Sequence, residues 1–218
     1  MVDLHKPAAD GADLAGNLPG QGARDRAAKV WAESLRVQPV RTMVARLTGR
    51  RTQERALRIS ARGEEIVGAV LERLGGRGWK VIHSVPVGWN QADIDHIVIG
   101  PGGVFTVNSK HHPKAVVTGT GATVTVDGEE VPYLQKAALE ADQAERRLSD
   151  ALGYHVEVTG IIALVHARSV TVKGQLRGAI MKDVRYLRRW FRGLRPYLSQ
   201  GQIEEIYGAA RRASLWTS

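Results

Sequence analysis

The runs DIDHIVIG at 93–100 and GVFTVNSK at 103–110 are separated only by Pro-Gly. Both runs are rich in β-branched residues, which favour strands. Two parallel strands need a crossover of a dozen or more residues, so this short break predicts an antiparallel hairpin. A third run of the same character, WKVIHSVPV at 79–87, precedes them and predicts another strand. The hairpin restricts the chain to folds whose sheet contains this antiparallel pair.

Residues on both sides of these strands follow a helical period. Apolar positions at steps of three and four predict an amphipathic helix over 63–74, and a second helix is expected over 134–152. Short strands are expected at 115–119 and 122–128 between them, and the apolar run 157–166 suits a strand covered on both faces. The order is helix, three strands, small hairpin, helix, strand, which predicts an α/β fold.

Segments outside this core differ in composition. Residues 1–23 are small and polar and are expected to form a disordered tail. Residues 24–60 are expected to form a basic helical arm of two helices interrupted near Pro39, and residues 61–172 a single folded domain. Residues 173–218 include a basic stretch and a final helix over 203–212, and are expected to be a basic extension packed on the core.

The net charge of +9 is distributed unevenly. Residues 24–62 contain eleven basic and three acidic residues, residues 173–195 contain eight and one, and residues 63–172 contain nine and thirteen. Arg supplies 23 of the 31 cations, and its planar guanidinium suits phosphate. Two basic arms around an acidic middle are typical of a nucleic-acid-binding protein. The alternative is that the Arg-rich helices only present solvated faces.

Several classes of protein are excluded. The chain has no Cys, so it has no disulfide framework, no thiolate nucleophile and no Cys-ligated metal. No apolar run approaches the roughly 20 residues of a membrane helix, and the first residues lack the pattern of a secretory signal. We therefore expect a cytoplasmic protein without a membrane partner. Trp190 and Phe191 lie among cations and could stack on bases, but a buried helix stripe is the favoured interpretation.

The hairpin carries a pattern of polar residues. If its turn is centred between Pro101 and Gly102, paired residue numbers sum to 203, so Asp95 lies opposite Asn108 and Asp93 opposite Lys110. Directly opposed Cβ atoms are about 5 Å apart, close enough for one Mg²⁺ to accept oxygens from Asp95 and Asn108. From the residues alone, the simpler interpretation is that Asp95 and Lys110 form an exposed cross-strand charge pair.

The motifs GEE at 63–65, IDHIVIGPGGVFTVNSK at 94–110 and PYLQ at 132–135 resemble the NERD (nuclease-related) domain, a branch of the PD-(D/E)XK nuclease superfamily. The resemblance covers about residues 60–170. It implies a restriction-endonuclease-like core with a mixed central sheet. It also implies cleavage of DNA with Mg²⁺ or Mn²⁺ as cofactor. Matched position by position, the implied metal ligands are Asp95, Asn108 and Glu64, and the implied catalytic residues are Asp95, Lys110, Asn108 and Gln135.

One position departs from the superfamily pattern, because Asn108 is an amide where the pattern has a carboxylate. Its carbonyl oxygen can still ligate Mg²⁺, but the lost charge predicts weaker metal binding. Two alternatives to a nuclease therefore stand: a nucleic-acid-binding module that has lost most or all catalysis, and a protein scaffold, with a homodimer as one form.

Single residues also have plainer interpretations. Glu64 could serve only as a first-turn acid that complements the helix dipole, and Gln135 could be surface polarity. His96 should face away from Asp95 and be a hydrogen-bonded core or interface histidine and not a metal ligand. His111 and His112 should diverge in an extended segment, with phosphate contact as their one candidate role.

Overall fold

A computed structural model describes residues 12–37, 53–88 and 92–217 of the chain. Its central sheet has the strand order β1 (Lys80–Val87), β2 (Ala92–Gly100), β3 (Gly103–His111), β7 (Val158–Val165) and β9 (Ile180–Asp183). β2 pairs antiparallel with both β1 and β3, whereas β7 pairs parallel with β3 and β9 pairs parallel with β7. The sheet is therefore mixed, and the order of elements is that of a restriction-endonuclease-like core, as predicted.

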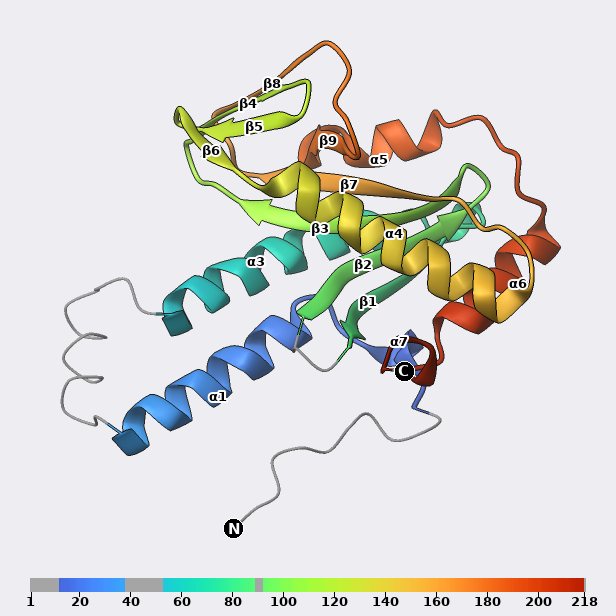
Figure 1. Cartoon of the computed structure of the whole chain (residues 1–218), viewed down its shortest axis with the longest axis horizontal. Coiled ribbons are helices and arrows are strands. Elements are labelled where there is room, and N and C mark those ends of the chain that lie inside the picture. The colour runs from blue at the N-terminus through green and yellow to red at the C-terminus, as the bar shows by residue number, and fades with distance from the viewer. Residues whose placement is uncertain (1–11, 38–52, 89–91, 218) are drawn as a thin grey trace.

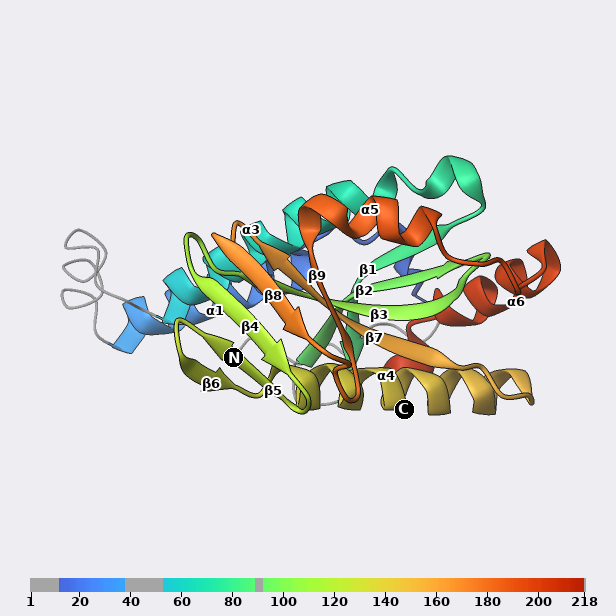
Figure 2. The same ribbon diagram turned by 90° about the horizontal axis from the view of Figure 1, so that it is seen from above.

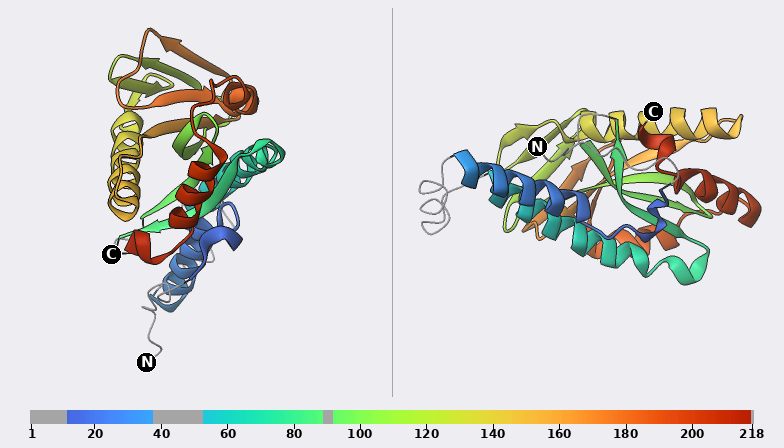
Figure 3. Two further views of the ribbon diagram at one scale, coloured as in Figure 1. Left: turned by 90° about the vertical axis from the view of Figure 1, so that its right-hand side faces the viewer. Right: turned by 90° about the horizontal axis from the view of Figure 1, so that it is seen from below.

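Helices cover both faces of this sheet (Figures 2 and 3). On one face, α3 (Gln53–Glu72) and α5 (Val184–Arg192) pack in one apolar cluster with Val98 and Phe105. On the other face, α4 (Tyr133–Leu152), α6 (Gln200–Ala210) and α7 (Ser214–Thr217) pack in a cluster with Ile97 and Ile99. Successive residues of β2 thus point into different cores, as strand geometry requires.

A second, smaller sheet lies above the first in the orientation of Figure 1. Its strand order is β6 (Glu129–Val131), β5 (Thr123–Val126), β4 (Val116–Thr120) and β8 (Ser169–Lys173), with β8 parallel to β4. The predicted small hairpin is present as β4 and β5. The strands β6 and β9 were not predicted, because runs of three and four residues carry almost no periodic signal.

The predicted register of the hairpin is confirmed from His96 to Gly100, where every pair of residue numbers sums to 203. The ladder ends there, so the expected pairs of Asp95 with Asn108 and of Asp93 with Lys110 do not form. Instead, the Ser109 N–H donates to the Asp95 carboxylate, 2.6 Å away. On the other side, β1 is interrupted opposite Asp95 by Ser84, whose φ of 47° is left-handed. Asp95 therefore lies where both ladders open.

The expectation that residues 1–23 form a disordered tail is wrong for residues 12–23. A 3₁₀ turn, η1 (Leu14–Gly16), packs on β1, and α1 (Gln21–Val37) follows. Leu14 is buried in the same core as Ile97, and its N–H donates to the Arg211 carbonyl. The burial of Leu14 in a core formed by residues far along the chain thus orders a segment that contains few apolar residues. Residues 1–11 lie outside the described residues.

The basic arm also differs from its prediction. Helix α3 begins at Gln53, so the last part of the arm and the first core helix are one continuous helix, which runs beside α1 (Figure 1). Gly63 lies inside it, where an added Cβ would come within 3.0 Å of the His111 Cβ. This glycine therefore permits close contact of α3 with β3 instead of starting a helix. Residues 38–52 of the predicted arm, with the interruption expected near Pro39, lie outside the described residues.

Candidate metal and phosphate site

Asp95 is the half-buried centre of the candidate site, at the opened end of β2. Burial raises the pKa of its carboxyl, while the nearby Lys110 ammonium and the hydrogen bond from Ser109 act in the opposite direction. Lys110 follows on β3, and its Nζ lies 5.2 Å from the centre of the Tyr133 ring. The Tyr133 hydroxyl is in turn 2.7 Å from His112 Nε2. The cation–π contact fixes the direction of the lysine beside Asp95.

Asn108 is buried on the same face of β3 as Lys110, with 7% of its surface exposed. Its Nδ2 donates to both carboxylate oxygens of Glu140, at 2.7 and 2.9 Å. A carboxylate only accepts hydrogen bonds, so this contact fixes which way the amide points. The other amide atom, Oδ1, is buried and has no hydrogen-bond partner among the described residues. A buried carbonyl oxygen without a partner is costly unless something binds it.

Glu140 was not identified from the sequence, although it supplies a carboxylate at the place where Asn108 lacks one. It lies on α4, and burial raises the pKa of its carboxyl to about 7, an effect opposed by the Asn108 hydrogen bond. A signal for it exists in the sequence. Tyr133, Lys136 and Glu140 are spaced by three and four residues, which places them on one face of a helix. Only the packing of α4 on the sheet shows that this face meets β3.

Glu64 lies on α3 and is 3% exposed. Burial and then the charge of Asp95 raise the pKa of Glu64 to about 8, although Arg26 and a hydrogen bond from Ser60 oppose the shift. Glu64 therefore lies within electrostatic range of Asp95. Arg26 comes from α1 and forms an ion pair with Asp93, whose own pKa is raised by burial.

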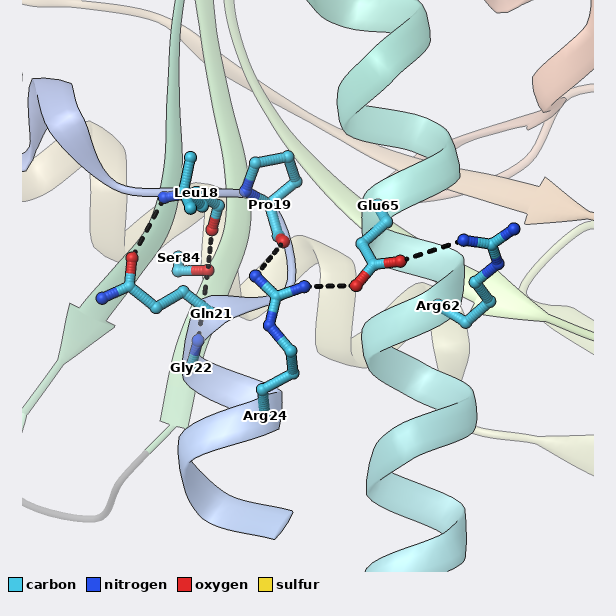
Figure 4. Close-up of polar contacts among 8 residues, drawn as sticks. All are labelled: Leu18, Pro19, Gln21, Gly22, Arg24, Arg62, Glu65 and Ser84. Carbon is cyan, nitrogen blue, oxygen red and sulfur yellow. Dashed lines mark hydrogen bonds and ion pairs between the residues drawn. The ribbon is translucent and has the colours of Figure 1, made fainter. Parts of the chain in front are cut away.

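The neighbouring Glu65 behaves differently. It forms ion pairs with Arg24 of α1 and with Arg62, and it is partly exposed (Figure 4). Arg24 also donates to the carbonyl of Pro19, 3.1 Å away. Two adjacent acids of one helix therefore have separate tasks: Glu64 faces Asp95, and Glu65 holds α1 against α3.

The start of α1 is anchored by Ser84, the residue that interrupts β1 (Figure 4). The Ser84 hydroxyl donates to the Leu18 carbonyl at 3.1 Å and accepts from the Gly22 N–H at 3.4 Å. A Cβ on Gly22 would fall 1.9 Å from Asp93 Oδ2, so a larger residue here would force the Asp93 carboxylate to move. The anchoring brings α1, and with it Arg26, to the rim of the acidic site.

Other predicted residues lie apart from this cluster. Gln135 is exposed in the first turn of α4. Glu140 lies five positions further along, so at 3.6 residues per turn the two side chains point to different sides of the helix. His96 faces away from Asp95 and lies within hydrogen-bond distance of His83 and of the Ser109 hydroxyl, as predicted for a core histidine. His111 and His112 do diverge: His111 contacts His166, and His112 contacts Tyr133.

The donor set fits a hard divalent cation. Among the residues that the structure describes, no three Asp, Glu or His side chains lie close enough to form a metal cluster on their own. The other oxygen donors of this region are the unpartnered Oδ1 of Asn108 and the carboxyl groups of Glu140 and Glu64, both of which lie within electrostatic range of Asp95. Oxygen-only donors are those that Mg²⁺ and Mn²⁺ prefer.

A mixed sheet of this order, with acids and a lysine where β2 and β3 part, defines a nuclease-like α/β protein. The family model for the nuclease-related domain, NERD, matches residues 59–165, so this part of the chain belongs to the NERD family. Glu64, Asp95, Asn108, Lys110 and Glu140 all fall within the match. No curated protein and no solved structure matches the chain. None of the described helices is long and apolar enough to cross a membrane.

Proposed function

We propose that this protein hydrolyses phosphodiester bonds in DNA with the help of Mg²⁺ or Mn²⁺. The observation that carries the proposal is the pairing of Asn108 with Glu140, which leaves the buried Asn108 Oδ1 unpartnered next to a carboxyl group that senses the charge of Asp95. Asp95 and Asn108, with Glu140 or Glu64, are the residues that would hold the ion. A bound divalent cation lowers the pKa of a coordinated water and stabilises negative charge on phosphate.

The protein's own residues supply the remaining chemistry. Lys110, held by Tyr133, places a positive charge beside Asp95, where it stabilises the charge that develops on the phosphate. Glu140, with a pKa of about 7, is suited to accept the proton of an attacking water near neutral pH. Asn108 orients that carboxylate through two hydrogen bonds.

The electrostatics of the site also support cation binding. Glu64 and Glu140 have raised pKa values because burial, and to a smaller extent the charge of Asp95, disfavours their charged forms. A bound cation would stabilise the charged forms of both carboxyl groups. Its binding should therefore release protons and become stronger as the pH rises.

A second function is favoured by one observation. Asn108 replaces an acid, and the described residues form no three-acid cluster, as expected of a nuclease fold that binds nucleic acid without cutting it. The two functions differ in whether the residues around Asp95 cleave the bound nucleic acid.

The test is cleavage of supercoiled and single-stranded DNA by the purified protein with Mn²⁺ or Mg²⁺, beside the variants Asp95→Ala and Lys110→Ala. The proposal predicts metal-dependent cleavage that both substitutions abolish. An inactive wild type, or cleavage that survives both substitutions, would contradict the proposal and favour the binding module.

A further inference from the structure

Helix α5 presents a row of arginines to solvent. Arg185, Arg188, Arg189 and Arg192 lie at positions i, i+3, i+4 and i+7, so they share one face of the helix. All four are exposed, and α5 contains no acidic residue. We call these four side chains the arginine stripe. It lies outside the residues that the NERD model matches.

The stripe is mostly without counter-charge. Arg185 is the exception, because Asp183, which caps the start of α5, forms an ion pair with it at 2.7 Å. Arg188, Arg189 and Arg192 make no ion pair with any residue that the structure describes. Three adjacent guanidinium groups repel one another, and an anionic partner would relieve that repulsion.

The opposite side of α5 is used by the core. Val184, Leu187 and Phe191 are buried against α3 and the sheet, and Trp190 packs against Phe105. The preference for Trp190 and Phe191 as core residues is thus in line with the structure. Because no apolar side of α5 remains to enter a bilayer, the helix lacks what a membrane-surface helix needs.

The stripe starts at the same edge of the sheet as the candidate site. In the strand register, Lys110 of β3 pairs with Leu164 of β7, and Leu164 pairs with Asp183 of β9. Two strand spacings, about 10 Å, therefore separate the backbones of Lys110 and Asp183. A polyanion that passes the site can reach the first turn of α5.

We propose that the arginine stripe of α5 is a docking surface for the phosphate backbone of nucleic acid, which holds substrate beside the Asp95 site. Arginine makes bidentate contacts to phosphate, and a stripe of this kind binds without reading sequence. The inference rests on the proposed function for its choice of partner, but it concerns binding alone and needs no cleavage.

The test is fluorescence anisotropy of a labelled 20-base-pair DNA duplex over a salt series, in EDTA so that cleavage plays no part. The double variant Arg188→Gln/Arg192→Gln is compared with a matched control, Arg146→Gln/Arg212→Gln. The control also removes two exposed cations, but from α4 and from the segment just after α6, on the face of the sheet that α5 does not cover. Circular dichroism establishes that each variant is folded.

We expect the α5 double variant to bind about tenfold more weakly and to lower the slope of log K against log salt by about 2, while the control stays near wild type. Arg188→Lys/Arg192→Lys should keep most of the slope, since it keeps the charge. Equal losses in both double variants, or no DNA binding by wild type, would overturn the proposal. So would α5-dependent binding to phosphatidylserine vesicles but not to DNA. Each of these results leaves the cleavage assay with Asp95→Ala to judge the hydrolase separately.

Discussion

The acidic site and the arginine stripe use charge in opposite ways. At the site, Glu64, Asp95 and Glu140 are wholly or partly buried, and burial raises the pKa of each carboxyl; the charge of Asp95 raises the pKa values of Glu64 and Glu140 further. On α5, the arginines are exposed, and three of the four have no ion-pair partner in the described parts of the chain. Burial disfavours the charged forms of the acids, and a small cation would stabilise them, whereas exposed cations attract a large anion from a distance. The family domain thus holds the proposed metal site, and the extension holds the proposed docking surface.

The largest expected effect concerns the buried acid. Glu64 has a pKa of about 8 in the folded protein against a reference value of 4.5. Between these values the folded state keeps a proton that the unfolded chain releases, so the free energy of unfolding falls as pH rises. Relative to Glu64→Gln, we expect wild type to lose about 3 kcal/mol from pH 5 to pH 8 without metal. Urea unfolding at several pH values measures this, and a pH-independent difference would show that Glu64 is not held protonated.

Next in size is the effect of removing the carboxylate that Asn108 orients. Glu140→Gln should lower the rate of metal-dependent cleavage about 100-fold, the usual loss when a general base is removed. Its affinity for DNA, measured by anisotropy in EDTA, should change little because the arginine stripe is untouched. A variant that cleaves like wild type would exclude Glu140 from the reaction.

Changing the partner of Glu140 should have a smaller effect on stability. Asn108→Asp replaces the donor that contacts both Glu140 oxygens with a second carboxylate. At pH 8 without metal, we expect a loss of about 2 kcal/mol in the free energy of unfolding. Mn²⁺ should restore much of it, because the variant has gained a charged ligand. Thermal melting with and without Mn²⁺ provides the measurement, and equal melting temperatures in both conditions would count against a cation between these residues.

The smallest effect belongs to the exposed acid next to Glu64. Glu65 pairs with Arg24 and Arg62 at the surface, and such pairs contribute at most about 1 kcal/mol. Glu65→Gln should therefore cost less than 1 kcal/mol in urea unfolding at low salt, and the difference should shrink in 1 M NaCl. A large loss that salt does not reduce would mean that the contact of α1 with α3 depends on Glu65 for more than charge.

The sequence was most informative where periodicity and short connections act together. The ends of β1, β2 and β3 lie within one residue of the predicted runs, because alternation and the Gly-Pro-Gly-Gly turn restrict both register and direction. The register placed Asp95 and Lys110 on the correct strands. It could not show that the ladder ends at His96, because that depends on the left-handed Ser84 of another strand and on the Asp95 side chain.

What was missed depends on packing between distant segments. In the sequence, Glu140 is one of several charged residues of α4. Its contact with Asn108 depends on which face of α4 packs against β3. The order of residues 12–23 depends on Leu14 reaching a core built by residues far along the chain. Gln135 was expected at the site from the family motif, yet the start of α4 leaves it exposed.

One measurement tests the contrast between the buried acids and the surface charges most directly. It is calorimetric titration of Mn²⁺ into the protein at pH 7 in two buffers with different ionisation enthalpies, beside Asp95→Ala and Glu65→Gln. We predict binding with proton release in wild type and in Glu65→Gln, and no binding heat in Asp95→Ala. Absence of heat in wild type, or equal binding by Asp95→Ala, would contradict a metal site on the buried acids.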